Sequence, residues 1–215
     1  MRTAIVSIWI ALVVAVVAQQ GHGRLFPPER LGELEGPDRD AWQRPDQIMD
    51  ALQIGENSIV ADVGAGGGWF TVRLAQRVRP NGHVYAEDIQ PQMIETIERR
   101  MTREGLTRNV TTVRGTADDP KLPAATVDAV LIVDTYHEIE HPVTLLKNVR
   151  KGLKPSGVVC IINFKKDGGG PGPSMDERVE PDQVIADARE AGLELRKHES
   201  FLRYQYMLTF GVADR

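Results

Sequence analysis

Cysteine is almost absent from this sequence of 215 residues, in which Cys160 is the single example. One thiol excludes an internal disulfide framework and any zinc site built from several cysteines. Aromatic residues make up only 6%, and 26 basic residues against 30 acidic ones leave a net charge of −4. Because no basic block stands out, the sequence argues against nucleic-acid binding through phosphates and leaves a small neutral or cationic substrate open.

A long apolar run occurs once, at the amino terminus. Arg2 precedes an almost uninterrupted apolar stretch over residues 4–18, a pattern typical of a secretory signal peptide cleaved before Gln19. The alternative is an uncleaved membrane anchor, although the stretch is shorter than the ~20 residues of a spanning helix. We therefore expect an exported (periplasmic or secreted) or membrane-anchored protein, with the domain on the cytoplasmic face possible if the segment is retained.

The rest of the chain divides into an irregular arm over residues 19–40, rich in glycine, proline and charge, and one domain over residues 41–215. Helices are predicted over residues 40–52, 69–78, 91–101, 142–149 and 181–191. Strands are predicted over residues 58–63, 83–86, 110–113, 127–133, 157–164, 193–201 and 205–210. Apolar strands that alternate with helices indicate an α/β fold whose mostly parallel sheet is covered on both faces, and the last two strands form an antiparallel hairpin.

A glycine cluster ends the first of these strands, within residues 60–68, and opens a helix. Glycines there let a ligand approach the backbone closely. The dinucleotide fingerprint needs a further glycine where this sequence has Trp69, which disfavours a nicotinamide cofactor. Asp62 precedes the cluster, and Asp88 follows the second strand, where a carboxylate can bind a ribose diol. Glu87 is the rival for that position.

Residues 62–68, 84–93 and 153–157 together resemble the class I S-adenosylmethionine-dependent methyltransferases, and the similarity covers about residues 40–212. The resemblance implies a Rossmann-like seven-stranded sheet and S-adenosyl-L-methionine as cofactor. It implies cofactor contacts from Asp62, Gly64, Ala65, Gly66, Asp88, Ile89, Thr116, Ala117, Asp118 and Asp134.

Within that set the resemblance implies separate tasks. Asp62 and the glycines would lie beside the methionine part, Asp88 would take the ribose hydroxyls, and Ile89 would face the adenine. Thr116 stands where the family usually has aspartate, so either its own hydroxyl or Asp118 is expected to take over the adenine contact.

The segment after the fourth strand carries an acid, a phenol and an imidazole close together. A general base assists methyl transfer when the acceptor is a hydroxyl or amine. We predict His137 as that base, with Tyr136 shaping the acceptor pocket and Glu138 orienting the imidazole. The alternative is that His137 only lines the edge of the sheet.

The same segment matches the zinc-protease motif H-E-x-x-H from His137 to His141. That chemistry needs both imidazoles on one face of a continuous helix, whereas Pro142 biases His141 away from helical geometry. We treat the match as accidental. Asp134 and Asn163 could in principle meet a divalent cation, but two ligands are too few, and no metal is predicted.

The sequence thus predicts a methyltransferase acting on a small-molecule acceptor. Its cofactor is made in the cytosol, whereas residues 1–18 indicate export from it. A noncatalytic exported binding protein on the same scaffold is therefore the alternative. Neither the acceptor nor the oligomeric state follows from the sequence.

Cleavage before Gln19 predicts that the chain purified from its native compartment lacks residues 1–18. Intact-mass measurement of that chain distinguishes the two fates of the segment, because an anchor would retain the full mass. A full-length mass would contradict the signal-peptide prediction.

Overall fold

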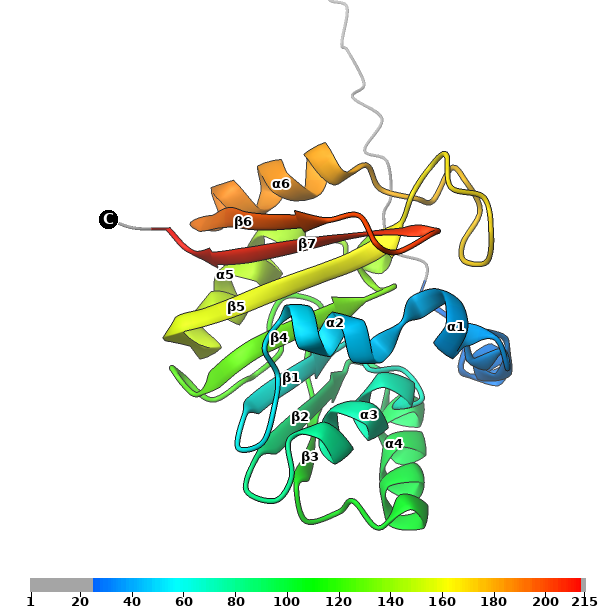
Figure 1. Ribbon diagram of the computed structural model, residues 1–215, viewed down its shortest axis with the longest axis vertical. Helices are drawn as coiled ribbons and strands as arrows, with labels where there is room; N and C mark the ends of the chain where they lie inside the picture. The colour runs from blue at the N-terminus through cyan, green and yellow to red at the C-terminus, as the bar shows by residue number, and fades with distance from the viewer. Residues whose placement is uncertain (1–24, 214–215) are drawn as a thin grey trace, which may run out of the picture.

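A seven-stranded sheet in the order β3-β2-β1-β4-β5-β7-β6 runs through the computed structural model, which describes residues 25–213 (Figure 1). The strands are β1 Ile59–Val63, β2 His83–Asp88, β3 Val110–Arg114, β4 Val127–Val133, β5 Leu153–Phe164, β6 Leu193–Glu199 and β7 Gln205–Val212. Strands β1 to β5 pair in parallel, and β7 pairs antiparallel with both β5 and β6. The predicted fold, with its closing hairpin, is confirmed.

Six α-helices and two 3₁₀ helices connect these strands in the described part of the chain. They are η1 Pro28–Glu35, α1 Arg39–Gln43, α2 Pro45–Ala51, α3 Trp69–Arg77, α4 Pro91–Glu104, η2 Tyr136–Glu138, α5 Pro142–Gly152 and α6 Pro181–Glu190. Five of them begin with a proline. Proline is favoured there because its fixed φ suits the first turn, where its missing N–H is not needed.

Helices cover both faces of the sheet, and each face has its own apolar core. Helices α2, α3 and α4 pack on one face, where Leu74 and Ile97 meet Leu131 of β4. Helices α5 and α6 pack on the other, where Leu146 and Val184 lie with alternate residues of the same strands. Because successive strand residues point to opposite faces, the strands of a doubly covered sheet must be apolar throughout.

Two predicted segments differ from the structure. The single helix expected over residues 40–52 is divided into α1 and α2 at Arg44, whose φ is 53°. The cause is Pro45, because a residue before proline is excluded from helical geometry by steric contact. The arm expected to be irregular contains the 3₁₀ helix η1 within its described part.

The amino-terminal prediction concerns residues 1–18, which lie outside the described residues. Within residues 25–213 no helix is long and apolar enough to cross a membrane.

A buried arginine organises the loop that follows β5. The Arg178 guanidinium donates hydrogen bonds to the carbonyl oxygens of Lys165, Gly169, Pro171 and Pro173. It also lies over the Phe164 ring. Backbone carbonyls that would otherwise lack partners are satisfied in this way, so the loop has a defined course beside the end of β5.

Strand β4 lies in the middle of the sheet, and we expect its buried side chains to contribute most to the free energy of unfolding. Leu131→Ala leaves a cavity in a fully buried site and should cost about 3 kcal/mol of the free energy of unfolding, measured by urea denaturation. Leu195→Ala is the control, because this side chain on edge strand β6 is 40% exposed. Equal losses from the two variants would contradict this assignment of the core.

Candidate functional site

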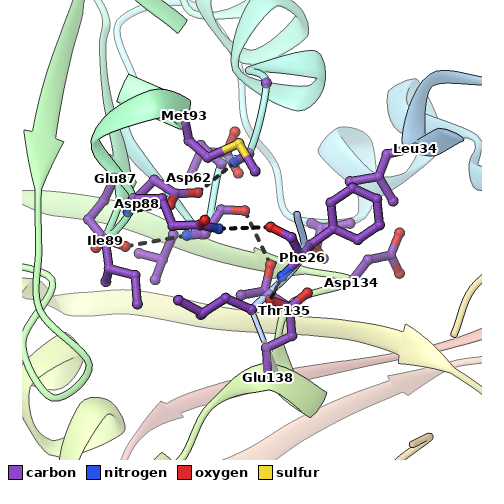
Figure 2. A pocket seen from close by; sticks show the side chains of 18 of the residues that line it. Phe26, Leu34, Asp62, Glu87, Asp88, Ile89, Met93, Asp134, Thr135 and Glu138 are labelled. Atoms are coloured by element: carbon purple, nitrogen blue, oxygen red, sulfur yellow. Dashed lines mark hydrogen bonds between the residues drawn. The ribbon is translucent and has the colours of Figure 1, made fainter. Parts of the chain in front are cut away.

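A cavity of about 260 Å³ lies at the carboxyl ends of β1, β2 and β4 (Figure 2). The strand order reverses between β1 and β4, and ligands of open α/β sheets bind at such a switch point. Part of the arm forms the opposite wall, through Leu25, Phe26, Leu31 and Leu34. The cavity therefore lies between the sheet edge and a segment that precedes the first strand.

The glycine loop is fixed by hydrogen bonds to the end of β2. Ala65 N–H donates to the Glu87 carbonyl at 2.8 Å, and Gly66 N–H donates to Asp88 Oδ2 at 2.9 Å. Gly64 has φ +71°, and a Cβ there would lie 2.3 Å from Thr135 Cγ2. Only glycine fits between β2 and the residue after β4, which explains the cluster seen in the sequence.

Asp88 has the geometry expected of a diol ligand. Its Oδ2 accepts the Gly66 N–H and its Oδ1 accepts the Gln90 N–H at 2.9 Å, so the carboxylate is oriented by the backbone. Each oxygen keeps a second lone pair, because a carboxylate oxygen can accept two hydrogen bonds. Two adjacent hydroxyl groups could therefore bind to it side by side.

The rival Glu87 is less suited to that task. Its Oε2 accepts the Gly64 N–H at 3.3 Å, and its Oε1 is buried without a hydrogen-bond partner among the described residues. A Cβ on Gly115 would lie 2.0 Å from Oε1, so the carboxyl is packed against the backbone. Burial raises the pKa of Glu87 to about 8, and the group is mostly protonated at neutral pH.

Asp62 and Arg39 line the inner end of the cavity. The Thr71 hydroxyl donates to Asp62 Oδ2 at 2.6 Å, and burial raises the pKa of Asp62 to about 6. The Arg39 guanidinium stacks on the Trp69 ring at 4.1 Å, and Arg73 lies over the same ring at 3.5 Å. Trp69, which stands where the dinucleotide fingerprint needs a glycine, thus makes cation–π contacts with two guanidinium groups.

Asp134 is held by a buried polar network rather than left open. Gln43 Nε2 donates to its Oδ2 at 3.2 Å, Gln205 Nε2 donates to its Oδ1, and Arg39 Nη2 lies 3.5 Å from Oδ2. Asp134 has φ 58°, a left-handed conformation that costs energy for a residue with a side chain. Burial raises its pKa to about 6. The network ties α1 to the ends of β4 and β7.

Two residues predicted for catalysis do not line the cavity. Tyr136 is buried in the core under α6, where its hydroxyl donates to Asp187 Oδ2 at 2.7 Å. His137 is absent from the cavity wall, and its Nδ1 is buried without a partner among the described residues. Burial lowers the pKa of His137, which is therefore neutral. Neither Tyr136 nor His137 therefore lines this cavity, and their catalytic roles stay a prediction.

Asp118 also lies outside the cavity lining, whereas Thr116 and Ala117 are part of it. The Asp118 carboxylate is half-exposed and lies 2.9 Å from Nδ1 of His141. Of the two candidates for the adenine contact, only Thr116 is in position to make it. Ile89, the residue expected beside the adenine, lines the cavity next to Asp88.

The H-E-x-x-H match does not form a metal site. Its first two residues end the short helix η2, and its last histidine precedes α5, so the two imidazoles do not share one helix. Among residues 25–213 no group of three or more histidine, cysteine, aspartate or glutamate side chains is arranged to hold a metal ion. The motif thus lacks the continuous helix on which a zinc protease places both imidazoles.

The arm supplies cavity residues that no sequence motif indicated. Phe26 N–H donates to Glu138 Oε2 at 2.9 Å, and Gln90 Nε2 donates to the Phe26 carbonyl at 3.1 Å. Glu35 of η1 forms an ion pair with Arg100 of α4. No local pattern announces these contacts, because they join residues that are far apart in the chain.

The charge of the lining fits a cationic cofactor. Among the described residues, seven carboxyl groups and one guanidinium, that of Arg39, line the cavity. A sulfonium and an ammonium group suit such an acidic enclosure, and the single guanidinium suits a carboxylate. With the diol geometry of Asp88, the lining fits the ribose hydroxyls and the charged groups of S-adenosylmethionine.

Residues 60–157 match a family model described as a methyltransferase domain. A probable cobalt-precorrin-6B C(15)-methyltransferase of Methanothermobacter thermautotrophicus is 33% identical over 114 residues, 53% of this chain and 56% of that protein. A demethylmenaquinone methyltransferase of Anoxybacillus flavithermus is 30% identical over 122 residues, 56% of this chain and 50% of that protein. The chain spans about half the length of these curated relatives.

A solved structure of a SAM-dependent methyltransferase from Aquifex aeolicus matches with a TM-score of 0.82 and 26% identity, covering 86% of this chain and 98% of that one. Fold, cavity and relatives agree, and together they support a class I S-adenosylmethionine-dependent methyltransferase. S-adenosyl-L-methionine is accordingly its cofactor.

The diol geometry predicts the effect of Asp88→Asn. Replacing one carboxylate oxygen by an amide removes an acceptor for a ribose hydroxyl, and we expect cofactor affinity to fall at least tenfold in calorimetry with S-adenosylmethionine. Asp118→Asn should bind normally, because the structure turns this side chain toward His141. A normal affinity for Asp88→Asn would refute the diol assignment.

Proposed function

We propose that this protein transfers a methyl group from S-adenosylmethionine to a small-molecule acceptor held at the carboxyl end of β4. One observation supports this best: the carboxylate fit for a diol and the polar side chains after β4 line the same cavity, which the arm covers. A cavity of about 260 Å³ beneath a covering segment suits a small molecule better than a folded macromolecule.

The bound cofactor would supply a methyl carbon activated by a positively charged sulfur. The chain's own residues then have to align it. Asp88 would hold the ribose, Arg39 would face the carboxylate, and Asp62 would lie near the ammonium group. Because displacement requires the nucleophile in line with the methyl carbon, fixed positions on the two sides of the cavity supply much of the rate.

The named relatives support a small-molecule acceptor of this kind. Two of them are named for a cobalt-precorrin and for demethylmenaquinone. Both are small organic molecules rather than proteins or nucleic acids. Because the chain spans only about half of those proteins, we carry over the size class of the acceptor and not its identity. Export or membrane attachment through residues 1–18 remains a prediction.

A methyl-transfer screen tests this function. The full chain would be incubated with methyl-labelled S-adenosylmethionine and a panel of catechol, 1,4-dihydroxynaphthalene, histamine and benzenethiol. We expect label in at least one acceptor, with matching release of S-adenosylhomocysteine, and less of both in Asp88→Asn. Cofactor binding without transfer to any member would favour the noncatalytic binding protein, and absence of binding would disprove the proposal.

A further inference from the structure

The seven carboxyl groups of the cavity differ in how many hydrogen bonds they can still accept. Asp134 has three donors, Asp88 is fixed by two backbone N–H groups, and Asp62 accepts the Thr71 hydroxyl. Asp134 is thus held in its network, whereas the lone pairs that Asp62 and Asp88 keep lie on the cofactor side of the cavity, at the ends of β1 and β2. Their geometry suits orientation of the backbone, the arm or the cofactor.

Three further carboxyl groups are unsuited to proton transfer for other reasons. Glu87 is packed against Gly115 and mostly protonated at neutral pH. Glu35 is paired with Arg100. Glu140 is exposed at the rim, where water solvates it.

Glu138 is the remaining group, and it combines burial with an open oxygen. Its side chain is 16% exposed. Oε2 accepts the Phe26 N–H, whereas Oε1 accepts no hydrogen bond among the described residues, and His137 Nε2 lies 3.8 Å from it, beyond hydrogen-bond distance. Oε1 can therefore accept a proton from a ligand without giving up an existing hydrogen bond.

The position of Glu138 matches the acceptor side of the cavity. It ends η2, which follows β4, while the groups fit for the cofactor lie on β1, β2 and their loops. Figure 2 shows Glu138 beside Thr135, across the cavity from Met93 and Glu87. A carboxylate in this place faces a molecule that lies over the end of β4.

We propose that Glu138 is the general base that takes the proton of the methyl acceptor, an inference that rests on the proposed function. As the acceptor heteroatom bonds to the methyl carbon, its proton passes to Oε1 of Glu138. The electron pair of the broken carbon–sulfur bond stays on sulfur. One sulfonium charge and one carboxylate charge disappear together, so the buried site becomes more neutral. The acceptor class is thus a hydroxyl, amine or thiol that carries a proton.

The surroundings of Glu138 favour this chemistry near neutral pH. Burial raises its pKa to about 7, the carboxylates of Asp88 and Glu177 raise it as well, and the Phe26 N–H opposes the shift. His137 beside it is neutral, because burial lowers the pKa of that imidazole. A base whose pKa lies close to the working pH is the most effective one. Below pH 7 the group gains a proton and activity should fall.

A hydrogen bond from the arm fixes the carboxyl group of the base. Phe26 N–H donates to Oε2 from a segment that lines the cavity, and this contact leaves Oε1 without a hydrogen bond from the arm. Glutamine at this position would still accept the Phe26 N–H through its amide oxygen. Glu138→Gln therefore removes the base and keeps the arm in place.

The test uses the panel acceptor that the wild-type chain methylates fastest. Glu138→Gln should lower kcat about 100-fold or more at pH 7.5 and abolish the decline of activity centred near pH 7. Its remaining activity should rise at high pH with ionisation of the acceptor itself. Affinity for S-adenosylmethionine should change less than twofold. Asp118→Asn is the matched control, because it removes a carboxylate that lies outside the cavity lining and faces His141, and it should keep kcat within twofold.

The protonation of Glu138 can also be measured directly, without any methyl transfer. Carbon-13 NMR of the glutamate carboxyl groups in the full chain should show a titration near pH 7 that is missing in Glu138→Gln. An unchanged kcat and pH profile in that variant, or titration at the usual pH of glutamate, would overturn the inference while leaving the proposed function intact. Failure of the wild-type chain to methylate any panel member would instead defeat the proposed function, and the inference with it.

Discussion

The return of the glycine loop onto the end of β2 is the constraint on which the site depends. Hydrogen bonds from Ala65 and Gly66 to β2 bring the first two strand ends together and orient Asp88. Gly64 meanwhile lies against Thr135 at the end of β4. One short loop thus sets the spacing between the cofactor side and the acceptor side. A side chain at Gly64 would force these elements apart, because interiors packed this closely do not absorb an added atom.

The electrostatics of the cavity follow from its enclosure. Carboxyl groups gathered at strand ends would be ordinary acids in water, but burial raises the pKa of Asp62, Glu87, Asp134 and Glu138. The cost of burying this acidity is offset by Arg39, by backbone N–H groups and, in the bound state, by a cationic ligand. The same property that selects a sulfonium compound gives one carboxyl group a pKa suited to proton transfer.

Closure by the arm connects the two sides. Phe26, η1 and α1 contact η2, α4 and the end of β4 through the Phe26–Glu138 hydrogen bond, the Glu35–Arg100 ion pair and the network around Asp134. These contacts enclose the cavity without adding a further layer to the fold. A segment that stands before the first strand is well placed for this, because it can cover the strand ends while both faces of the sheet are occupied by helices.

Local chemistry determined most of what the sequence could reveal. Continuous apolar runs predicted the strands, and proline positions predicted helix starts. The glycine loop with Asp62 and Asp88 carried part of the family resemblance that implies the cofactor. Only tertiary structure decided which side chains reach the acceptor side. Neighbours on one turn diverge, with His137 outside the wall and Glu138 on it, and the partner of Glu138 is Phe26, 112 residues away. The direction in which a side chain points from a short helix depends on packing. So does a contact between residues that are far apart in the chain, and neither leaves a pattern in the sequence.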